Sequence, residues 1–298
     1  MATGTRLTKA EIGNILVNER EYQSLVGSLM YAMTGTRPDL AYAVSQLSQF
    51  NAKPTAIHLT AAKRVLRYLK GHADLGITYR DDDNSLNGYC DTDWGANEDR
   101  KSISGYLFML GGGAISWSSK KQSTVALSST EAEYIALVQA AKESIWLQRL
   151  LSELGWTERD HKVIWEDNQG AIALAVNPEY HACTKHIDIQ YHFIRECVEN
   201  DRIKLEYIPT AEQLADALTK IMPRNRHWEL TEGMGMGKLE QHAKLKQMSN
   251  ITESGSTTPS PKSPSSGSVG EYAEDSGDQS KTLDDSRRLQ KRSTRAEL

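Results

Sequence analysis

Apolar residues recur at helical spacing over the first quarter of the chain. Three stretches between residues 22 and 71 carry them at intervals of three and four: 22–35, 37–51 and 54–71. Proline stands near the start of the second and third stretches, and glycine closes the first and third. We therefore predict three consecutive helices here.

The pattern from residue 85 to residue 222 alternates between the strand period and the helix period. Hairpins come first and crossovers later, so we expect an α/β fold with a mixed sheet covered by helices. The predicted strands are 86–91, 104–110, 113–119, 161–167 and 203–208, and the predicted helices are 129–154, 168–176, 185–200 and 211–220.

The remaining segments have weaker patterns. Residues 249–298 are rich in Ser, Pro and Gly and almost free of large apolar side chains, so we expect a disordered tail ending in the basic run RRLQKRSTR. We expect a flexible N-terminus over 1–21 and a partly helical extension over 223–248. These segments flank a helical segment at 22–76 and the sheet domain at 85–222.

Charge and composition narrow the function. The 298 residues carry a net charge of −4, so the chain lacks the global basic field of a tight duplex binder. No apolar run is long enough for a membrane span, and the N-terminus does not read as a signal peptide. The three cysteines lack paired spacing, which favours a reducing intracellular compartment.

One helix face carries a local basic stripe. Lys63, Arg64, Arg67 and Lys70 fall within about a third of the circumference of the predicted helix 54–71. A stripe of this kind suits a phosphate backbone, and an ordinary solvated helix face explains it equally well.

Glu133 is the most unusual acid in the sequence. In the predicted helix 129–154 it lies on the apolar face, where an unpaired carboxylate costs several kcal/mol unless it is neutralised, paired or bound to a metal ion. The apolar residues expected on that face are Leu137, Ala140, Leu147, Leu151 and Leu154.

Three aspartates occupy positions that converge with Glu133 on one end of the predicted sheet. Asp91 and Asp167 end strands, and Asp216 lies early in the last predicted helix. Each also has an ordinary explanation, as a turn residue, a helix cap or an acid favoured by the helix dipole. Together, four carboxylates suit two Mg²⁺ or Mn²⁺ ions and hydrolysis of a phosphodiester.

The segments around these acids resemble a known family. GYCDTDWG, SSTEAEYIAL, WEDNQGAIALAV and YIPTAEQLADALTK are similar to the ribonuclease H domain of copia-type retrotransposon Pol polyproteins, over about residues 85–222. The helical segment resembles the C-terminal end of the reverse transcriptase that precedes this domain. The resemblance implies a ribonuclease H-like mixed five-stranded sheet flanked by helices.

The resemblance also implies an activity and a set of residues. It places the four metal-binding, catalytic carboxylates on Asp91, Glu133, Asp167 and Asp216, with Asp93 as a companion. The expected reaction is endonucleolytic hydrolysis of the RNA strand of an RNA–DNA hybrid by two-metal catalysis, as a step of transposition. The nucleic-acid contacts we expect are Lys63, Arg64, Arg67, Lys70, Lys120, Lys121, Gln122, Asn168, Lys185 and His186.

Partners and location follow from the same resemblance. The expected partners are an RNA–DNA hybrid and other parts of a Pol polyprotein, with no membrane. The expected location is cytoplasmic, including virus-like particles, with nuclear entry through the basic tail as an alternative.

Departures from the family leave alternatives open. The sequence contains no polymerase palm or aspartate-pair motif, so a reverse transcriptase is not expected, and the loop before Asp216 lacks the His of cellular ribonucleases H. An integrase is disfavoured because Glu133 precedes Asp167 in the order of acids. A catalytically idle or domesticated remnant that binds nucleic acid stays open. So does a zinc site drawn from His181, Cys183, His186, His192 and Cys197.

Overall fold

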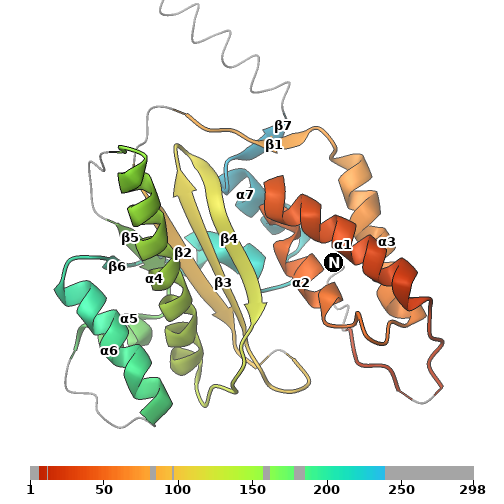
Figure 1. Cartoon of the computed structure of the whole chain (residues 1–298), viewed down its shortest axis with the longest axis horizontal. Coiled ribbons are helices and arrows are strands. Elements are labelled where there is room, and N and C mark those ends of the chain that lie inside the picture. The colour runs from red at the N-terminus through yellow and green to blue at the C-terminus, as the bar shows by residue number, and fades with distance from the viewer. Residues whose placement is uncertain are drawn as a thin grey trace, which may run out of the picture. The chain divides into compact units, whose positions relative to one another are not determined.

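The computed structural model describes residues 7–11, 13–80, 85–95, 97–156, 162–177 and 185–238, with only the backbone for 185–189. The chain divides into a compact unit at 1–253 and a second unit at 254–298, and all described residues lie in the first. Figure 1 shows a central sheet with helices on both sides. No helix among the described residues combines the length and apolar character needed to cross a bilayer.

The sheet confirms the predicted fold class. Strands β2 (Asn87–Asp93), β3 (Ile103–Leu110) and β4 (Gly113–Lys121) form an antiparallel meander. Strands β5 (Val163–Glu166) and β6 (Lys204–Tyr207) run parallel to β2. The order β4-β3-β2-β5-β6 is the mixed five-stranded sheet of the ribonuclease H-like fold, with all five strands where the sequence predicts them.

One face of this sheet packs against three helices, α4 (Ser129–Glu153), α5 (Gln169–Val176) and α6 (Lys185–Glu199) (Figure 1). The shared core is apolar and includes Phe108 of β3. Helix α4 buries Leu137, Ala140 and Leu147 as its period predicts, whereas Leu154, one residue past its end, is 72% exposed because the helix has by then passed the sheet.

The N-terminal helices also form where predicted. They are α1 (Glu19–Thr36), α2 (Ala41–Ser48), which follows a 3₁₀ turn at Pro38–Leu40, and α3 (Ala56–Gly71). Helix α1 begins three residues earlier than the apolar pattern indicates, because the Asn18 side chain caps it by accepting the backbone N–H groups of Arg20 and Glu21.

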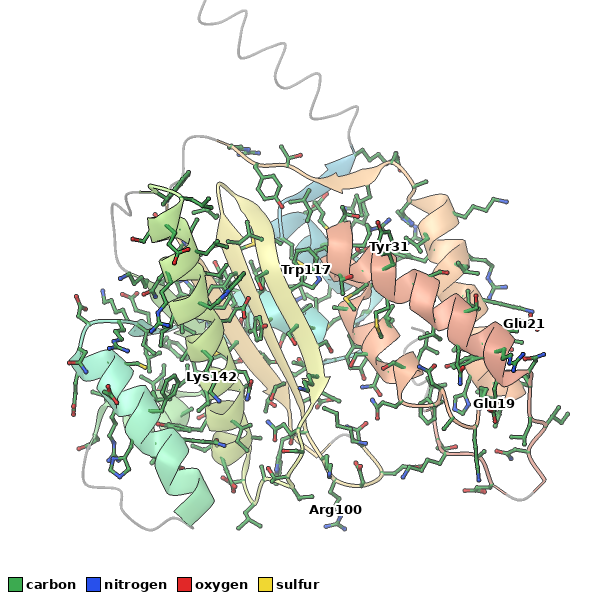
Figure 2. All side chains as sticks on the ribbon, in the orientation of Figure 1. Glu19, Glu21, Tyr31, Arg100, Trp117 and Lys142 are labelled. Carbon is green, nitrogen blue, oxygen red and sulfur yellow. The ribbon has the colours of Figure 1, made fainter. Side chains whose placement is uncertain are left out.

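These helices contact the sheet domain on the strand β4 side. The indole Nε1 of Trp117 in β4 donates to the carbonyl of Met33 in α1 at 3.1 Å, and Lys121 Nζ donates to Gln49 Oε1 at 3.2 Å. Figure 2 shows Trp117 beside the α1 turn that carries Tyr31. The helical segment and the sheet domain therefore share hydrogen bonds as well as an apolar contact.

The predicted last helix, 211–220, is wrong. Two 3₁₀ segments, η2 (Thr210–Glu212) and η3 (Leu214–Leu218), replace it. Gln213 between them is extended and fully buried, and its Nε2 donates to the carbonyl of Cys90 at 2.9 Å. The side chain therefore enters the end of the sheet, and the backbone cannot continue as one helix.

The chain ends its described part with a helix and a short strand. Helix α7 (Arg224–Gly233) lies within the predicted extension, and β7 (Met236–Lys238) pairs antiparallel with β1 (Leu75–Ile77) in a two-stranded sheet that the pattern did not indicate. The predicted tail at 249–298 lies outside the described residues.

Candidate metal centre

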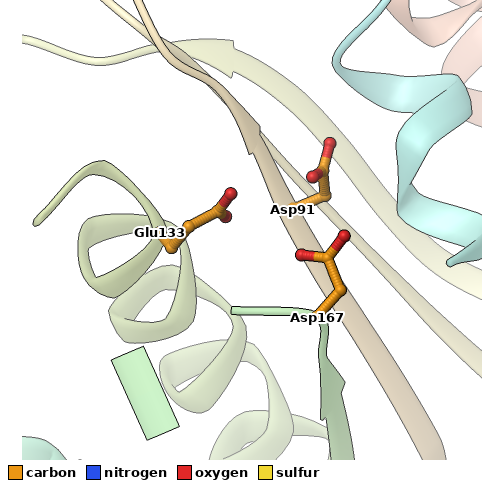
Figure 3. Close-up of side chains that lie close together, drawn as sticks. All are labelled: Asp91, Glu133 and Asp167. Carbon is orange, nitrogen blue, oxygen red and sulfur yellow. The ribbon is translucent and has the colours of Figure 1, made fainter. Parts of the chain in front are cut away.

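Three of the four predicted carboxylates meet at one end of the sheet. Asp91 lies in β2, Glu133 in the second turn of α4, and Asp167 directly after β5. One oxygen from each lies within 4.8 Å of the others (Figure 3). Asp91 is 1% exposed and Glu133 is 7% exposed, so the group opens to solvent mainly beside Asp167.

A glycine lets the C-terminal turn approach this group. Gly105 of β3 lies opposite Asp91 in the antiparallel register. A Cβ atom at Gly105 would lie 2.8 Å from Thr219 Cγ2 and 2.9 Å from Leu218 Cβ, which is closer than real contacts allow. The absence of a side chain there allows segment η3 and the two residues after it to pack against Asp91.

The buried carboxylates lack compensating charge. Burial, with Glu166 and Asp91 nearby, raises the pKa of Glu133 to about 11. Burial raises the pKa of Asp91 to about 7, although Lys220 acts in the opposite direction. Glu133 Oε2 is buried and has no hydrogen-bond partner among the described protein groups. An oxygen-only set with an unpartnered oxygen fits a hard divalent cation.

Asp216 joins the site through a lysine. It is 5% exposed, and its Oδ1 lies 2.8 Å from Lys220 Nζ, which also lies 3.1 Å from Asp91 Oδ1. The hydroxyl of Thr219 donates to Asp91 Oδ2. Burial lowers the pKa of Lys220, but the two aspartates more than offset this and raise it. Asp91 therefore lies between Glu133 and Asp167 on one side and Asp216 on the other.

Glu166 is a residue that our sequence analysis missed. It is fully buried, accepts a hydrogen bond from Cys90 Sγ at 3.0 Å, and accepts the backbone N–H of Asn168 at 3.0 Å. Burial raises its pKa to about 8. Its place two residues after Ile164 in strand β5 puts it on the same buried face, and that strand period is the signal that could have identified it.

Hydrogen bonds hold the turn that carries Asp167. Its Oδ2 accepts the hydroxyl of Thr210 at 2.7 Å, from segment η2. The next residue, Asn168, caps helix α5 by accepting the N–H of Ala171 at 3.0 Å. Asn168 therefore supports the turn, in addition to any contact with nucleic acid.

The other predicted contact residues are distributed unevenly. The four residues of the α3 basic stripe (Lys63, Arg64, Arg67 and Lys70) are exposed, and so is Lys120. Lys121 forms an ion pair with Asp99 at 2.7 Å, and Gln122 is 6% exposed and hydrogen-bonded inside the protein. The side chains of Lys185 and His186 lie outside the described residues.

The zinc alternative falls largely on residues that are not described, since His181 and Cys183 lie between 178 and 184 and the His186 side chain lies outside the described part. Of the remaining two candidates, His192 is exposed and Cys197 is 2% exposed, on different faces of α6. Within the described ranges, Asp91, Glu133 and Asp167 are the one group of His, Cys and acidic side chains close enough to share an ion.

Comparisons with known proteins agree with this site. The chain is 50% identical over 216 residues to the retrovirus-related Pol polyprotein from transposon TNT 1-94 of Nicotiana tabacum, a match covering 72% of this chain. It is 44% identical over 241 residues to that from transposon RE2 of Arabidopsis thaliana, covering 80% of this chain. The chain spans 16% of the length of each of these relatives.

No protein-family model matches the sequence. Among solved structures, ribonuclease H1 LC11, isolated from compost by a metagenomic approach, is similar at a TM-score of 0.36 and 16% identity, covering 46% of this chain and 93% of that one. The identity to the transposon proteins carries the assignment: the chain belongs to the copia-type retrotransposon Pol polyproteins, as a ribonuclease H domain preceded by the C-terminal end of a reverse transcriptase.

Proposed function

We propose that this chain hydrolyses the RNA strand of RNA–DNA hybrids with divalent metal ions held by Asp91, Glu133, Asp167 and Asp216. The observation that carries the proposal is the group of three carboxylates within 4.8 Å of one another, two of them buried. Membership of the Pol polyprotein family supports the reaction type. The fold supports it further, because these acids stand at the carboxyl end of β5, beside β2.

The chain's own residues divide the work by position. Asp91, Glu133 and Asp167 would hold one ion, and Asp91 with Asp216 would hold a second, since Asp91 lies between the two sides. Bound Mg²⁺ or Mn²⁺ would supply an activated water and stabilise charge on the leaving oxygen. Thr210 keeps Asp167 oriented toward the site, and Thr219 does the same for Asp91.

Substrate binding would rely on local positive charge, because the net charge of the chain is −4. The exposed α3 basic stripe and Lys120 are the side chains we propose for phosphate contacts. Contacts to ribose 2′-hydroxyls across the shallow minor groove would select the RNA strand. Binding that depends on phosphate contacts weakens as salt rises.

The test is cleavage of an end-labelled RNA–DNA hybrid by the full chain in Mg²⁺, with Asp91→Asn beside it. The matched control is Asp201→Asn, the same chemical change in the turn before β6, at the opposite end of the sheet. Asp201 has φ of 52°, a conformation that Asn adopts readily.

We expect the wild type and Asp201→Asn to cut the RNA strand, and Asp91→Asn to lose more than about 100-fold in rate, the order seen when a key electrostatic group is removed from an active site. Cleavage that persists in Asp91→Asn would refute the site. Absence of cleavage by the wild type, with hybrid binding intact, would replace the hydrolase with a nucleic-acid-binding remnant.

A further inference from the structure

Gln122 forms an internal contact that the metal-binding carboxylates do not explain. It follows strand β4, is 6% exposed, and donates its backbone N–H to the carbonyl of Ser102 at 2.9 Å. Its side-chain Nε2 lies 2.8 Å from Ser104 Oγ and 2.9 Å from the carbonyl of Ala132, with Thr92 Oγ1 at 3.4 Å. One amide nitrogen therefore touches β2, β3 and α4.

The contacted residues are the chain neighbours of two metal-binding carboxylates. Thr92 follows Asp91 in strand β2, and Ala132 precedes Glu133 in helix α4. An amide nitrogen has two hydrogens, so the two shorter contacts, to Ser104 and to Ala132, use both of them. Because Ala132 offers a carbonyl, which only accepts, the nitrogen of the amide has to face the helix.

The arrangement has an energetic cost that indicates a purpose. Gln122 Oε1 is buried and has no hydrogen-bond partner among the described groups. An unsatisfied buried acceptor costs about 1–3 kcal/mol, which an apolar side chain of the same size would avoid. What an apolar side chain would lose is the hydrogen bond from the strands to the first turns of α4.

We propose that Gln122 is a positioning residue that sets the separation of Asp91 and Glu133 by tying the start of α4 to strands β2 and β3. This inference rests on the proposed metal-dependent function. The side chain does not reach the carboxylates themselves; it acts on the backbone carbonyl next to Glu133 and on the strand beside Asp91. This role replaces the nucleic-acid contact expected for Gln122, because the side chain lies inside the protein.

The test substitutes Gln122→Met, which keeps the length of the side chain and removes the donor. Gln148→Met is the matched control, because Gln148 lies on the same helix and its Nε2 also donates to a hydroxyl and a carbonyl, Ser144 Oγ at 2.9 Å and Arg202 O at 3.0 Å. It lies about 22 Å along the helix from Glu133 at the helical rise of ~1.5 Å per residue.

The measurement is Mn²⁺ binding to the full chain by titration calorimetry, with thermal unfolding of each metal-free variant. We expect the dissociation constant to rise about 10–100-fold in Gln122→Met, the range for residues that orient metal ligands, and less than about 3-fold in Gln148→Met at a comparable change in stability. A purely structural role for Gln122 would lower both stabilities and leave Mn²⁺ affinity alike in the two variants.

Two further outcomes keep the inferences separate. If the wild type itself binds no Mn²⁺, the proposed metal-dependent function fails, and the role of Gln122 fails with it. If the wild type binds Mn²⁺ and Gln122→Met binds equally well, only the positioning role is overturned. Should Gln122→Met not fold, Gln122→Asn, which keeps the amide on a shorter side chain, is expected to weaken Mn²⁺ affinity, and unchanged affinity there would refute the proposal.

Discussion

Replacing Glu133 by Gln should stabilise the metal-free protein. Burial and neighbouring carboxylates raise the pKa of Glu133 from 4.5 to about 11, so the folded state holds this group neutral while the unfolded chain ionises it. A raised carboxyl pKa contributes stability that is present below the unfolded value and is lost as pH rises toward the folded value. Gln is neutral at every pH and avoids that loss.

The magnitude follows from the linkage between protonation and folding. Each pKa unit corresponds to about 1.36 kcal/mol, so at about pH 8 holding Glu133 neutral costs up to about 5 kcal/mol, and at about pH 5 less than about 1 kcal/mol. Part of the pKa shift comes from Glu166 and Asp91, which also take up protons in this range. We therefore expect Glu133→Gln to gain at least about 2 kcal/mol at about pH 8.

The assay is urea unfolding of wild type and Glu133→Gln with a chelator, at both pH values. Glu153→Gln is the control, since Glu153 is an exposed acid at the other end of α4, and its effect should stay within about 0.5 kcal/mol at either pH. Mg²⁺ should then stabilise the wild type more than the Gln variant, because the ion binds the folded carboxylates. A Gln variant that is no more stable than wild type at about pH 8 would refute the reasoning.

Three further predictions address other parts of the site. In the chelated protein, Lys220→Met should raise the pKa of Asp91 above about 7 by at least about one unit, followed by carbon NMR of the carboxyl group; an unchanged midpoint would contradict the pairing. Thr210→Val should weaken Mn²⁺ binding up to about 10-fold by freeing Asp167, with wild-type affinity as the contrary result in calorimetry. Neutralising the α3 basic stripe to Gln should weaken hybrid binding and flatten its salt dependence by about 0.9 per lost phosphate contact in fluorescence anisotropy, whereas Lys142→Gln, on the exposed side of α4 (Figure 2), should change neither.

Local patterns were sufficient for most of the secondary structure. Period, caps and breakers placed all five strands of the mixed sheet and the helices that cover it, because burial of one face imposes a repeat that survives in the sequence. The same reasoning placed Glu133 on a buried helix face, and it is 7% exposed in the structure. The segment at 211–220 failed because its backbone follows a long-range contact, from Gln213 to the strand of Cys90, rather than its own propensity.

Convergence of the acids is what only the tertiary structure decided. Strand ends and a helix period made Asp91, Glu133 and Asp167 candidates, but their mutual approach depends on sheet order and on the docking of α4, which involve residues far apart in sequence. The link from Asp216 through Lys220 to Asp91, and the buried side chains of Glu166 and Gln122, leave weak or no local signals. By itself the sequence determined which residues are chemically suited to a metal centre; the folded chain determined their charge environment, because burial and neighbouring charges set the pKa of each carboxylate.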